Sequence, residues 1–336
     1  MKAYVLEGIN DLQYKDVSEP ECPEGWAVVK VKACGICSSD IPRIFTKGTY
    51  HFPTIPGHEF AGLVVKVGSE GDQNWIGKRV GVFPLIPCKE CEQCRQKKYE
   101  LCTSYDYTGS RRDGAFAEYV AVPVWNLIAL PDLIPYTEAA MLEPLAVALH
   151  AVKRVEIKQG DSFAVVGTGM IGFAVAQWAR AKGAACVYVI GRSESKRALA
   201  ESQPGVTYLI GSADLPKVDC VVEAVGTPDA VKKAIEMAAP EGRVVLMGNP
   251  SGDISLEQDV YWKILRKQLT VTGTWNSSYD GENPSDWTEV IDYLARKKMD
   301  VSNLISHSFA KDQLPEGLKL MKEHKEPYCK VMTEWE

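Results

Sequence analysis

The sequence lacks the features that would place this protein in a membrane or on nucleic acid. No run of about 18 or more apolar residues is present, the length that a transmembrane helix needs. Basic charge is not in excess, because 44 acidic residues face 38 basic ones and the formal net charge is −6. This balance disfavours nucleic acid and anionic membranes. The opening MKAYVLEGIN has no apolar core and predicts a strand rather than a signal peptide. We therefore expect a cytoplasmic protein that binds neither membranes nor nucleic acid.

Internal repeats and low-complexity segments are also absent, so the 336 residues are available for ordinary domains, about two at this length. Over the first 130 or so residues, short β-rich runs alternate with Gly and Pro turns. Examples are Trp26–Gly35, Gly62–Gly68 and Arg79–Leu85. Many short strands separated by frequent turns predict a β-rich, barrel-like domain.

In the middle of the chain the pattern changes to alternating helices and strands. Thr137–Val155 is rich in Ala and Leu and predicts one helix with Thr137 as its N-cap. Ser162–Gly191 follows the pattern strand, glycine turn, helix and strand, and Val218–Gly226 and Gly242–Gly248 predict further strands. This alternation is typical of a doubly wound parallel sheet. The fold class is therefore α/β.

Leu269–Trp275 is the last strand of this pattern, and the residues after it are too few for a domain of their own. We expect them to return to the first domain. Residues 1–148 and 276–336 would then form one discontinuous catalytic domain, and residues 149–275 a nucleotide-binding domain.

Four of the ten cysteines, Cys88, Cys91, Cys94 and Cys102, form the pattern C-x2-C-x2-C-x7-C. Disulfides are typical of small secreted chains. Four thiolates on one loop instead match the tetrahedral demand of Zn²⁺ and leave no position for a substrate. An iron–sulfur cluster is compatible with the composition, but the compact spacing on a polar loop favours zinc. We expect one structural zinc here.

A second set of metal-binding residue types lies outside this loop. Cys37 is in CGICSSD, His58 and Glu59 are in PGHEFAG, and Glu143 is in MLEPLA. A thiolate, an imidazole and a carboxylate suit an open, catalytic zinc, which can bind a substrate oxygen and lower its pKa. Each residue alone has an ordinary structural explanation. Their joint presence beside the four-cysteine loop and a nucleotide motif predicts a catalytic zinc.

The nucleotide motif G-T-G-M-I-G lies where a predicted strand meets a predicted helix. Gly167 permits the tight turn, Gly169 lets the backbone approach a pyrophosphate, and Gly172 lets the helix pack on the strand. Met170 and Ile171 complete the motif at the helix N-terminus, where N–H groups can bind phosphate. The motif predicts a dinucleotide cofactor.

Gly191 occupies the end of the next strand, where NAD sites usually carry Asp or Glu. Arg192 and Ser193 follow and can bind a 2′-phosphate, with Lys196 or Arg197 assisting. A solvated basic turn is the alternative interpretation. We therefore expect NADP as the preferred cofactor, with NAD possible.

Together these residues resemble the zinc-containing medium-chain dehydrogenase/reductase superfamily, the group of alcohol, sorbitol and threonine dehydrogenases, over essentially the whole chain. The resemblance implies a GroES-like catalytic domain and a Rossmann domain, with the active site in the cleft between them. It also implies a homo-oligomer, either a dimer or a tetramer. The implied activity is zinc-dependent interconversion of a secondary alcohol and a ketone by hydride transfer with NAD(P).

Several stretches, including PRIF and GSRRDG, resemble the galactitol-1-phosphate 5-dehydrogenase branch of that superfamily. The implied substrate is a small-molecule polyol phosphate such as galactitol 1-phosphate. An unphosphorylated polyol of the sorbitol or L-iditol type is the alternative, and a non-catalytic NADP-binding protein is a more distant one. Gly191 departs from the branch, where an NAD-type Asp would be expected.

The resemblance also implies roles for individual residues. Cys37, His58 and either Glu59 or Glu143 would bind the catalytic zinc, and Asp40 would support them rather than bind. Sorbitol and threonine dehydrogenases usually carry His where this chain has Pro42, so Ser39, with water and cofactor hydroxyls, would take the substrate proton. The candidates for a substrate phosphate are Arg43, Lys47, Arg111 and Arg112, for which surface solubility is the alternative role. Trp275 and Asn276 follow a strand end and are expected to line the substrate site.

Overall fold

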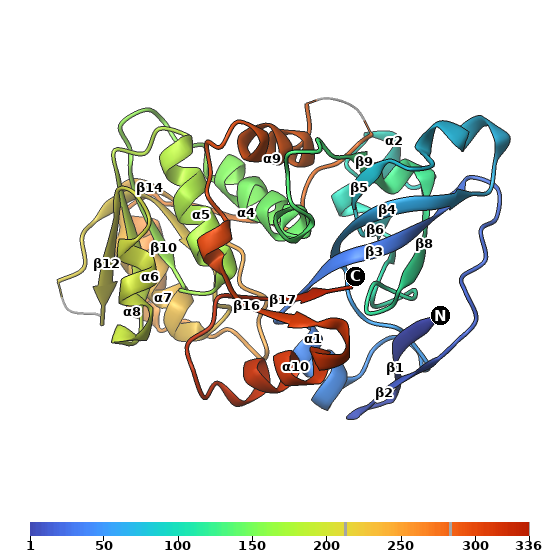
Figure 1. Ribbon diagram of the computed structural model, residues 1–336. Helices are drawn as coiled ribbons and strands as arrows, with labels where there is room; N and C mark the ends of the chain where they lie inside the picture. The colour runs from blue at the N-terminus through green and yellow to red at the C-terminus, as the bar shows by residue number, and fades with distance from the viewer. Residues whose placement is uncertain (212–213, 282–283, 336) are drawn as a thin grey trace. The chain divides into compact units, whose positions relative to one another are not determined.

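The computed structural model describes residues 1–211, 214–281 and 284–335 (Figure 1). The chain divides into two compact units. Unit 1 contains Met1–Glu143 and Ser278–Glu336, and unit 2 contains Pro144–Ser277. Among the residues within these ranges, no helix has the length and apolar character needed to cross a membrane.

Unit 2 is built on a six-stranded parallel sheet with the strand order β12-β11-β10-β13-β14-β15. Counted along the chain this order is 3-2-1-4-5-6, the order of dinucleotide-binding doubly wound sheets. The predicted α/β class is therefore confirmed. The strands are β10 (Ser162–Val166), β11 (Cys186–Gly191), β12 (Val206–Ile210), β13 (Val218–Glu223), β14 (Ala238–Leu246) and β15 (Thr270–Gly273).

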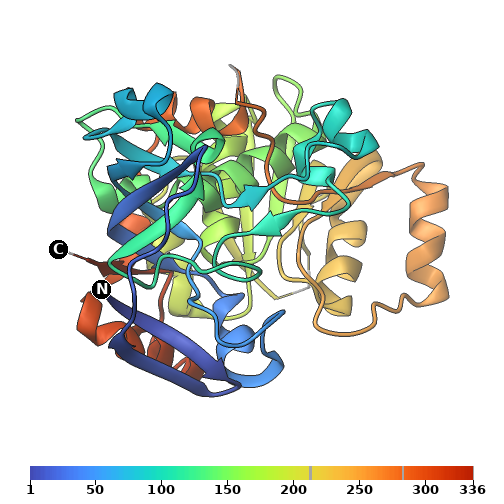
Figure 2. The same cartoon turned by 90° about the vertical axis from the view of Figure 1, so that its right-hand side faces the viewer.

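Helices flank this sheet because the strands carry apolar side chains on both faces. Helix α5 (Met170–Ala181) packs on β10 and β11, and its Phe173 and Trp178 are fully buried. Helix α7 (Pro228–Met237) begins at an N-cap, since the Thr227 hydroxyl accepts the Ala230 N–H. The short helix α6 (Arg197–Glu201) contacts β12, and α8 (Gln258–Arg266) contacts α7 and lies at the periphery (Figure 2).

The single helix predicted for Thr137–Val155 is wrong at its start. The structure has a short helix α3 (Tyr136–Ala139) and then α4 (Leu142–Val155), and the residue before α3 is Pro135 rather than a Thr cap. Pro144 explains the break. Its ring has no N–H to donate and would clash with the carbonyl four residues earlier, so a continuous helix cannot pass through it, whereas the first turn of α4 tolerates it.

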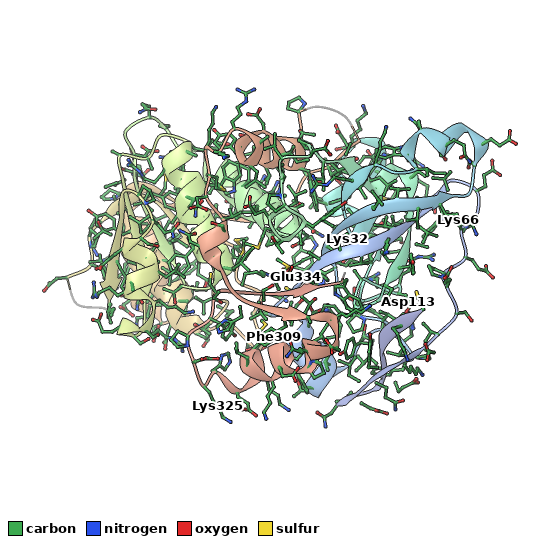
Figure 3. All side chains as sticks on the ribbon, in the orientation of Figure 1. Lys32, Lys66, Asp113, Phe309, Lys325 and Glu334 are labelled. Carbon is green, nitrogen blue, oxygen red and sulfur yellow. The ribbon has the colours of Figure 1, made fainter. Side chains whose placement is uncertain are left out.

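Unit 1 is β-rich, as predicted. Its main sheet has the order β16-β17-β3-β4-β5-β9, and β8 pairs with β3. The C-terminal strands β16 and β17 lie side by side, and Figure 3 labels Phe309 and Glu334 on them. The strands are β3 (Trp26–Ile36), β4 (Glu59–Val67), β5 (Arg79–Val82), β8 (Tyr119–Pro123), β9 (Leu127–Ala129), β16 (Ile305–Ala310) and β17 (Lys330–Glu334).

Smaller elements complete unit 1. The hairpin β1 (Lys2–Gly8) and β2 (Asp11–Asp16) is dark blue in Figure 2. The short strands β6 (Leu85–Ile86) and β7 (Asp106–Tyr107) pair on either side of the cysteine-rich loop. Besides α3, the α-helices described in unit 1 are α1 (Asp40–Pro42), which continues as a π-helical turn over Arg43–Lys47, α2 (Glu92–Arg95), α9 (Asp286–Ala295) and α10 (Leu314–Glu323).

Candidate functional site

The four cysteines of the loop converge on one point. Their sulfurs lie within 4.8 Å of one another. The Sγ–Sγ distances are 3.4 Å between Cys88 and Cys102, and 3.9 Å both between Cys88 and Cys94 and between Cys91 and Cys102. Four sulfurs placed about 2.3 Å from a zinc ion form a tetrahedron with edges of about 3.8 Å. The set fits a structural zinc, and all ten cysteines are free of disulfides.

The backbone around this loop favours thiolates. Backbone N–H groups of Thr103 and Cys94 donate toward the Cys91 sulfur and lower the pKa of its thiol to about 5. The Cys88 and Cys91 backbone N–H groups also point at sulfurs, at 3.3 Å from Cys102 Sγ and 3.4 Å from Cys88 Sγ. Donors aimed at the charged form stabilise it, whereas burial raises the pKa of the Cys94 and Cys102 thiols. A bound cation would favour their thiolates.

The second predicted cluster is also assembled. Cys37 follows the end of β3, and Glu59 begins β4, opposite Gly35 of β3. Antiparallel pairing therefore brings these segments together, and ligand atoms of Cys37, His58 and Glu59 lie within 4.8 Å of one another. A side chain on Gly35 would overlap the Glu59 carboxylate, so a glycine is needed there to leave it room.

Glu143 lies outside this group of three, although it is close to it. It is buried in the first turn of α4, and the Tyr107 hydroxyl donates to its Oε1 at 3.2 Å. Burial raises the pKa of the Glu143 carboxyl to about 7, an effect opposed by His58 and reinforced by the negative charge of Glu59. Two acidic side chains thus lie within electrostatic reach of one imidazole.

Lys330 is a site residue that the sequence analysis missed. It begins β17, which pairs antiparallel with β3. Its buried ammonium donates to Glu59 Oε2 and, at 3.3 Å, to the Ile36 carbonyl. Burial lowers the pKa of Lys330, but the negative charges of Glu59 and Cys37 outweigh this effect and the pKa lies above its ordinary value. Lys330 and Glu59 are therefore a buried ion pair.

Asp40 contacts two residues of the cluster, Cys37 and His58. It is fully buried, and its carboxylate accepts the Cys37 N–H at 3.0 Å and the Arg43 guanidinium at 2.6 Å. His58 Nδ1 lies 3.7 Å from Asp40 Oδ1 and is buried without a hydrogen-bond partner among the described residues. The candidate ligand group of Cys37, His58 and Glu59 does not include Asp40, and its role as a supporting residue stays a prediction.

Ser39 is next to the cluster as well. Its hydroxyl donates to Cys37 Sγ at 3.2 Å, and its backbone N–H lies 3.5 Å from the same sulfur. A hydroxyl in this position can exchange its sulfur partner for a substrate oxygen. The mixed donors thiolate, imidazole and carboxylate fit a catalytic zinc.

The four cationic candidates for a substrate phosphate form two groups, one on the turn Arg43–Lys47 and the other beside a hollow. Arg43 is bound to Asp40, and Lys47 is exposed at the end of the π-helical turn. Arg112 binds Asp106 and lies 5.1 Å over the Trp26 ring. Arg111 and Arg112 line a hollow of about 820 Å³ whose lining residues include neither Cys37 nor the candidate ligands His58, Glu59 and Glu143.

The nucleotide motif has the local geometry that its sequence predicts. Gly167 follows β10 with φ of 132°, which L side chains rarely adopt. Gly169 is the N-cap of α5, where Met170 is buried and Ile171 half-buried. A Cβ on Gly172 would lie 2.9 Å from the Gly167 carbonyl carbon, so helix and strand pack closely only with glycine there.

The expected 2′-phosphate residues follow β11. Arg192 and Ser193 are exposed. The Arg197 guanidinium binds the Glu194 carboxylate, and its Nη1 also donates to Glu201 Oε1 at 3.1 Å. Trp275 is 50% exposed after β15, and Asn276 has a left-handed φ of 58°.

Comparison with known proteins shows two matching families. Residues 23–132 match the alcohol dehydrogenase GroES-like domain, and residues 171–296 match the zinc-binding dehydrogenase family. Galactitol 1-phosphate 5-dehydrogenase of Escherichia coli (strain K12) is 36% identical over 290 residues, 83% of this chain and 84% of that protein.

Solved structures agree with this result. The crystal structure of galactitol-1-phosphate dehydrogenase from Escherichia coli matches with a TM-score of 0.92 and 33% identity, over 99% of this chain and 100% of that one. A structure from Sinorhizobium meliloti 1021, described as a zinc-binding dehydrogenase bound to NADP, matches with a TM-score of 0.88 and 30% identity. It covers 99% of this chain and 98% of that chain.

Proposed function

Because the chain belongs to the zinc-containing medium-chain dehydrogenase/reductase superfamily, whose members are zinc- and NAD(P)-dependent alcohol dehydrogenases, we propose that it oxidises a polyol phosphate such as galactitol 1-phosphate with NADP. The observation that carries the proposal is the Cys37–His58–Glu59 cluster with Ser39 on its sulfur. The likeness to galactitol 1-phosphate 5-dehydrogenase supports the substrate class.

In this proposal Cys37 and His58 hold the catalytic zinc, together with Glu59 or Glu143. When bound, the zinc supplies a Lewis acid toward the substrate hydroxyl, and the cofactor supplies the hydride acceptor. Lys330 holds one oxygen of Glu59 and Tyr107 holds one of Glu143. Which of the two carboxylates binds the zinc therefore depends on how strongly each is held by its other partner, Lys330 for Glu59 and Tyr107 for Glu143.

Ser39 takes the substrate proton in this proposal. Its hydroxyl turns from Cys37 Sγ toward the substrate oxygen and accepts that proton while passing its own to water or a cofactor hydroxyl. Asp40, held in place by Arg43 and the Cys37 N–H, faces His58 Nδ1 and leaves Nε2 for the metal. We assign this role to Ser39 because this chain has Pro42 where sorbitol and threonine dehydrogenases usually carry a histidine.

Arg43 and Lys47 are the cations we propose for the substrate phosphate. Arg43 is in electrostatic contact with the cluster through Asp40, and Lys47 ends the same turn with an exposed ammonium. Arg111 and Arg112 are not included, because both line the separate hollow, whose lining residues include none of the candidate zinc ligands. For the cofactor, Arg192 and Ser193 are proposed to bind the 2′-phosphate, since Gly191 offers no carboxylate to repel it.

Cofactor reduction by the zinc-loaded protein tests the proposal, with galactitol 1-phosphate and galactitol each offered with NADP and with NAD. We expect a large preference in kcat/KM for the phosphate ester and for NADP. Lys47→Gln should lower kcat/KM for the phosphate ester about tenfold and leave galactitol unchanged. Arg112→Gln, the matched control, should change neither. Turnover of galactitol alone would instead identify a polyol dehydrogenase of the sorbitol type.

A further inference from the structure

The end of strand β11 is where doubly wound sheets distinguish NAD from NADP. A carboxylate there binds the ribose 2′-hydroxyl of NAD, whereas a nearby arginine accommodates the 2′-phosphate of NADP. In this chain β11 ends at Gly191. The φ of Gly191 is not positive, so its backbone conformation is open to any residue. Glycine must be present for another reason.

That reason is the space taken by Tyr208 of the neighbouring strand β12. The two strands pair in parallel, with Val189 opposite Tyr208. The Tyr208 side chain is 4% exposed, and its hydroxyl donates to the Ser193 carbonyl at 2.8 Å. A Cβ on residue 191 would overlap the Tyr208 hydroxyl oxygen and lie 2.5 Å from Cζ and 2.9 Å from Cε2. A side chain at 191 and this ring position exclude each other.

The same tyrosine fixes the turn that follows β11. One end of the turn is held by its hydrogen bond to Ser193. The other end is held by Arg197, which binds Glu194 and lies 5.3 Å over the Tyr208 ring. Arg192, between the end of β11 and the anchored Ser193, is exposed, and its side chain makes no hydrogen bond or ion pair with the residues that the structure describes. Its guanidinium is therefore available to an anion.

We propose that Tyr208 determines cofactor specificity. Its ring keeps a carboxylate out of position 191, and its hydroxyl holds the Gly191–Ser193 turn so that Arg192 and Ser193 can receive the 2′-phosphate of NADP. This proposal rests on the NADP-dependent function proposed above. It adds Tyr208 of β12, a residue that acts on the cofactor site by positioning the Gly191–Ser193 turn.

The test measures direct binding of NADP and NAD to the zinc-loaded full chain by calorimetry, without substrate. We expect Gly191→Asp alone to gain no affinity for NAD. The double variant Gly191→Asp/Tyr208→Val should bind NAD about tenfold or more tightly than Gly191→Asp, because the carboxylate then has room to accept hydrogen bonds from the ribose. Gly191→Asp/Tyr208→Phe, the matched control, should behave like Gly191→Asp, since the ring carbons remain.

Tyr208→Phe in the natural background tests the hydroxyl separately, and it keeps the proposal testable if a double variant fails to fold. Loss of one neutral hydrogen bond should raise the Kd of NADP about fivefold and leave the Kd of NAD unchanged. The proposal is overturned if Gly191→Asp alone binds NAD as tightly as the valine double variant, or if Tyr208→Phe leaves the Kd of NADP unchanged. A preference of the natural protein for NAD would contradict the proposed cofactor. Comparing Gly191→Asp with its Tyr208→Val and Tyr208→Phe double variants would still show whether Tyr208 excludes the carboxylate. Failure to oxidise a polyol phosphate affects none of these measurements.

Discussion

Lys330 and Glu59 are the residues whose burial makes the candidate zinc site most sensitive to substitution. Each is almost completely buried, and each is the other's charged partner. Removing one member of such a pair leaves an uncompensated charge in a low dielectric. The pair therefore connects the chemistry of the site to the stability of unit 1.

Lys330→Met should lower the free energy of unfolding of the zinc-free protein by about 3 kcal/mol or more, the usual cost of breaking a buried pair. Urea unfolding followed by circular dichroism measures it. Lys325→Met is the matched control, because Lys325 is exposed (Figure 3) and should change the free energy by less than about 0.5 kcal/mol. Equal effects of the two substitutions would contradict a structural role for the buried pair.

At the scale of elements, the segment Cys88–Cys102 has almost no core of its own. Only Cys94 and Cys102 are buried among its described residues, and its helices are single turns. Such a segment gains little from apolar burial, so a bound metal must supply most of its folding energy.

Cys94→Ser should therefore remove about one zinc per chain and open the loop to trypsin at Arg95, Lys97 and Lys98, while the second zinc remains. Metal analysis and limited proteolysis measure both effects. Cys22→Ser, outside both clusters, should keep the natural zinc content and the natural cleavage pattern. A protected loop in Cys94→Ser would show that the loop folds without its metal.

A polar contact between the parallel strands β10 and β13 predicts that the stability of unit 2 depends on pH. The Asp219 carboxylate of β13 accepts the Ser162 hydroxyl at 2.6 Å and its N–H at 2.8 Å. These hydrogen bonds, helped by the positive charge of Arg243, hold the pKa of Asp219 below its ordinary value of 3.8. A depressed pKa contributes stability that is full above the ordinary pKa and is lost as the pH falls through the folded value.

We therefore expect the difference in unfolding free energy between natural protein and Asp219→Asn to be constant between about pH 5 and 7 and to shrink below about pH 4. Chemical unfolding at several pH values measures this difference. Asp229→Asn, at the first turn of α7, provides a control on the same unit. A difference that grows on acidification would have the wrong sign for this mechanism.

The sequence predicted the elements whose signals are local, and residue types together with the family resemblance predicted the Cys37, His58 and Glu59 cluster, but the contacts of Lys330 and Tyr208 were missed. The glycine motif and the four-cysteine loop could be recognised because each lies within one short stretch, and the alternation of strands and helices because each of its elements has its own local pattern. The ion pair of Lys330 with Glu59 joins residues 271 positions apart, and only the pairing of β17 with β3 brings them together. Tyr208 likewise becomes meaningful only when β12 lies beside β11. The helix break before Pro144 was readable in principle, because proline chemistry is local.

For the whole molecule, the residues proposed to bind zinc and those proposed to bind the dinucleotide lie in different units. The candidate zinc ligands Cys37, His58, Glu59 and Glu143 and the four loop cysteines lie in unit 1, whereas the glycine motif and the turn after β11 lie in unit 2. A ligand stabilises the structure that binds it by RT ln(1 + [L]/Kd), which is about 2.7 kcal/mol at a hundredfold excess over Kd. The effect is therefore expected to begin in the segments that touch the ligand.

Hydrogen exchange read by mass spectrometry can locate these effects. We expect a chelator to increase exchange in Cys37–Glu59 and Cys88–Cys102, and NADP at a hundredfold excess over its Kd to slow exchange in Ser162–Gly172 and Cys186–Ile210. The hairpin Lys2–Asp16, which carries none of the proposed ligands, serves as the internal reference for both experiments. Chelator-induced exchange confined to Ser162–Gly172, or NADP protection absent from that segment, would contradict the assignment of zinc to unit 1 and of the dinucleotide to unit 2.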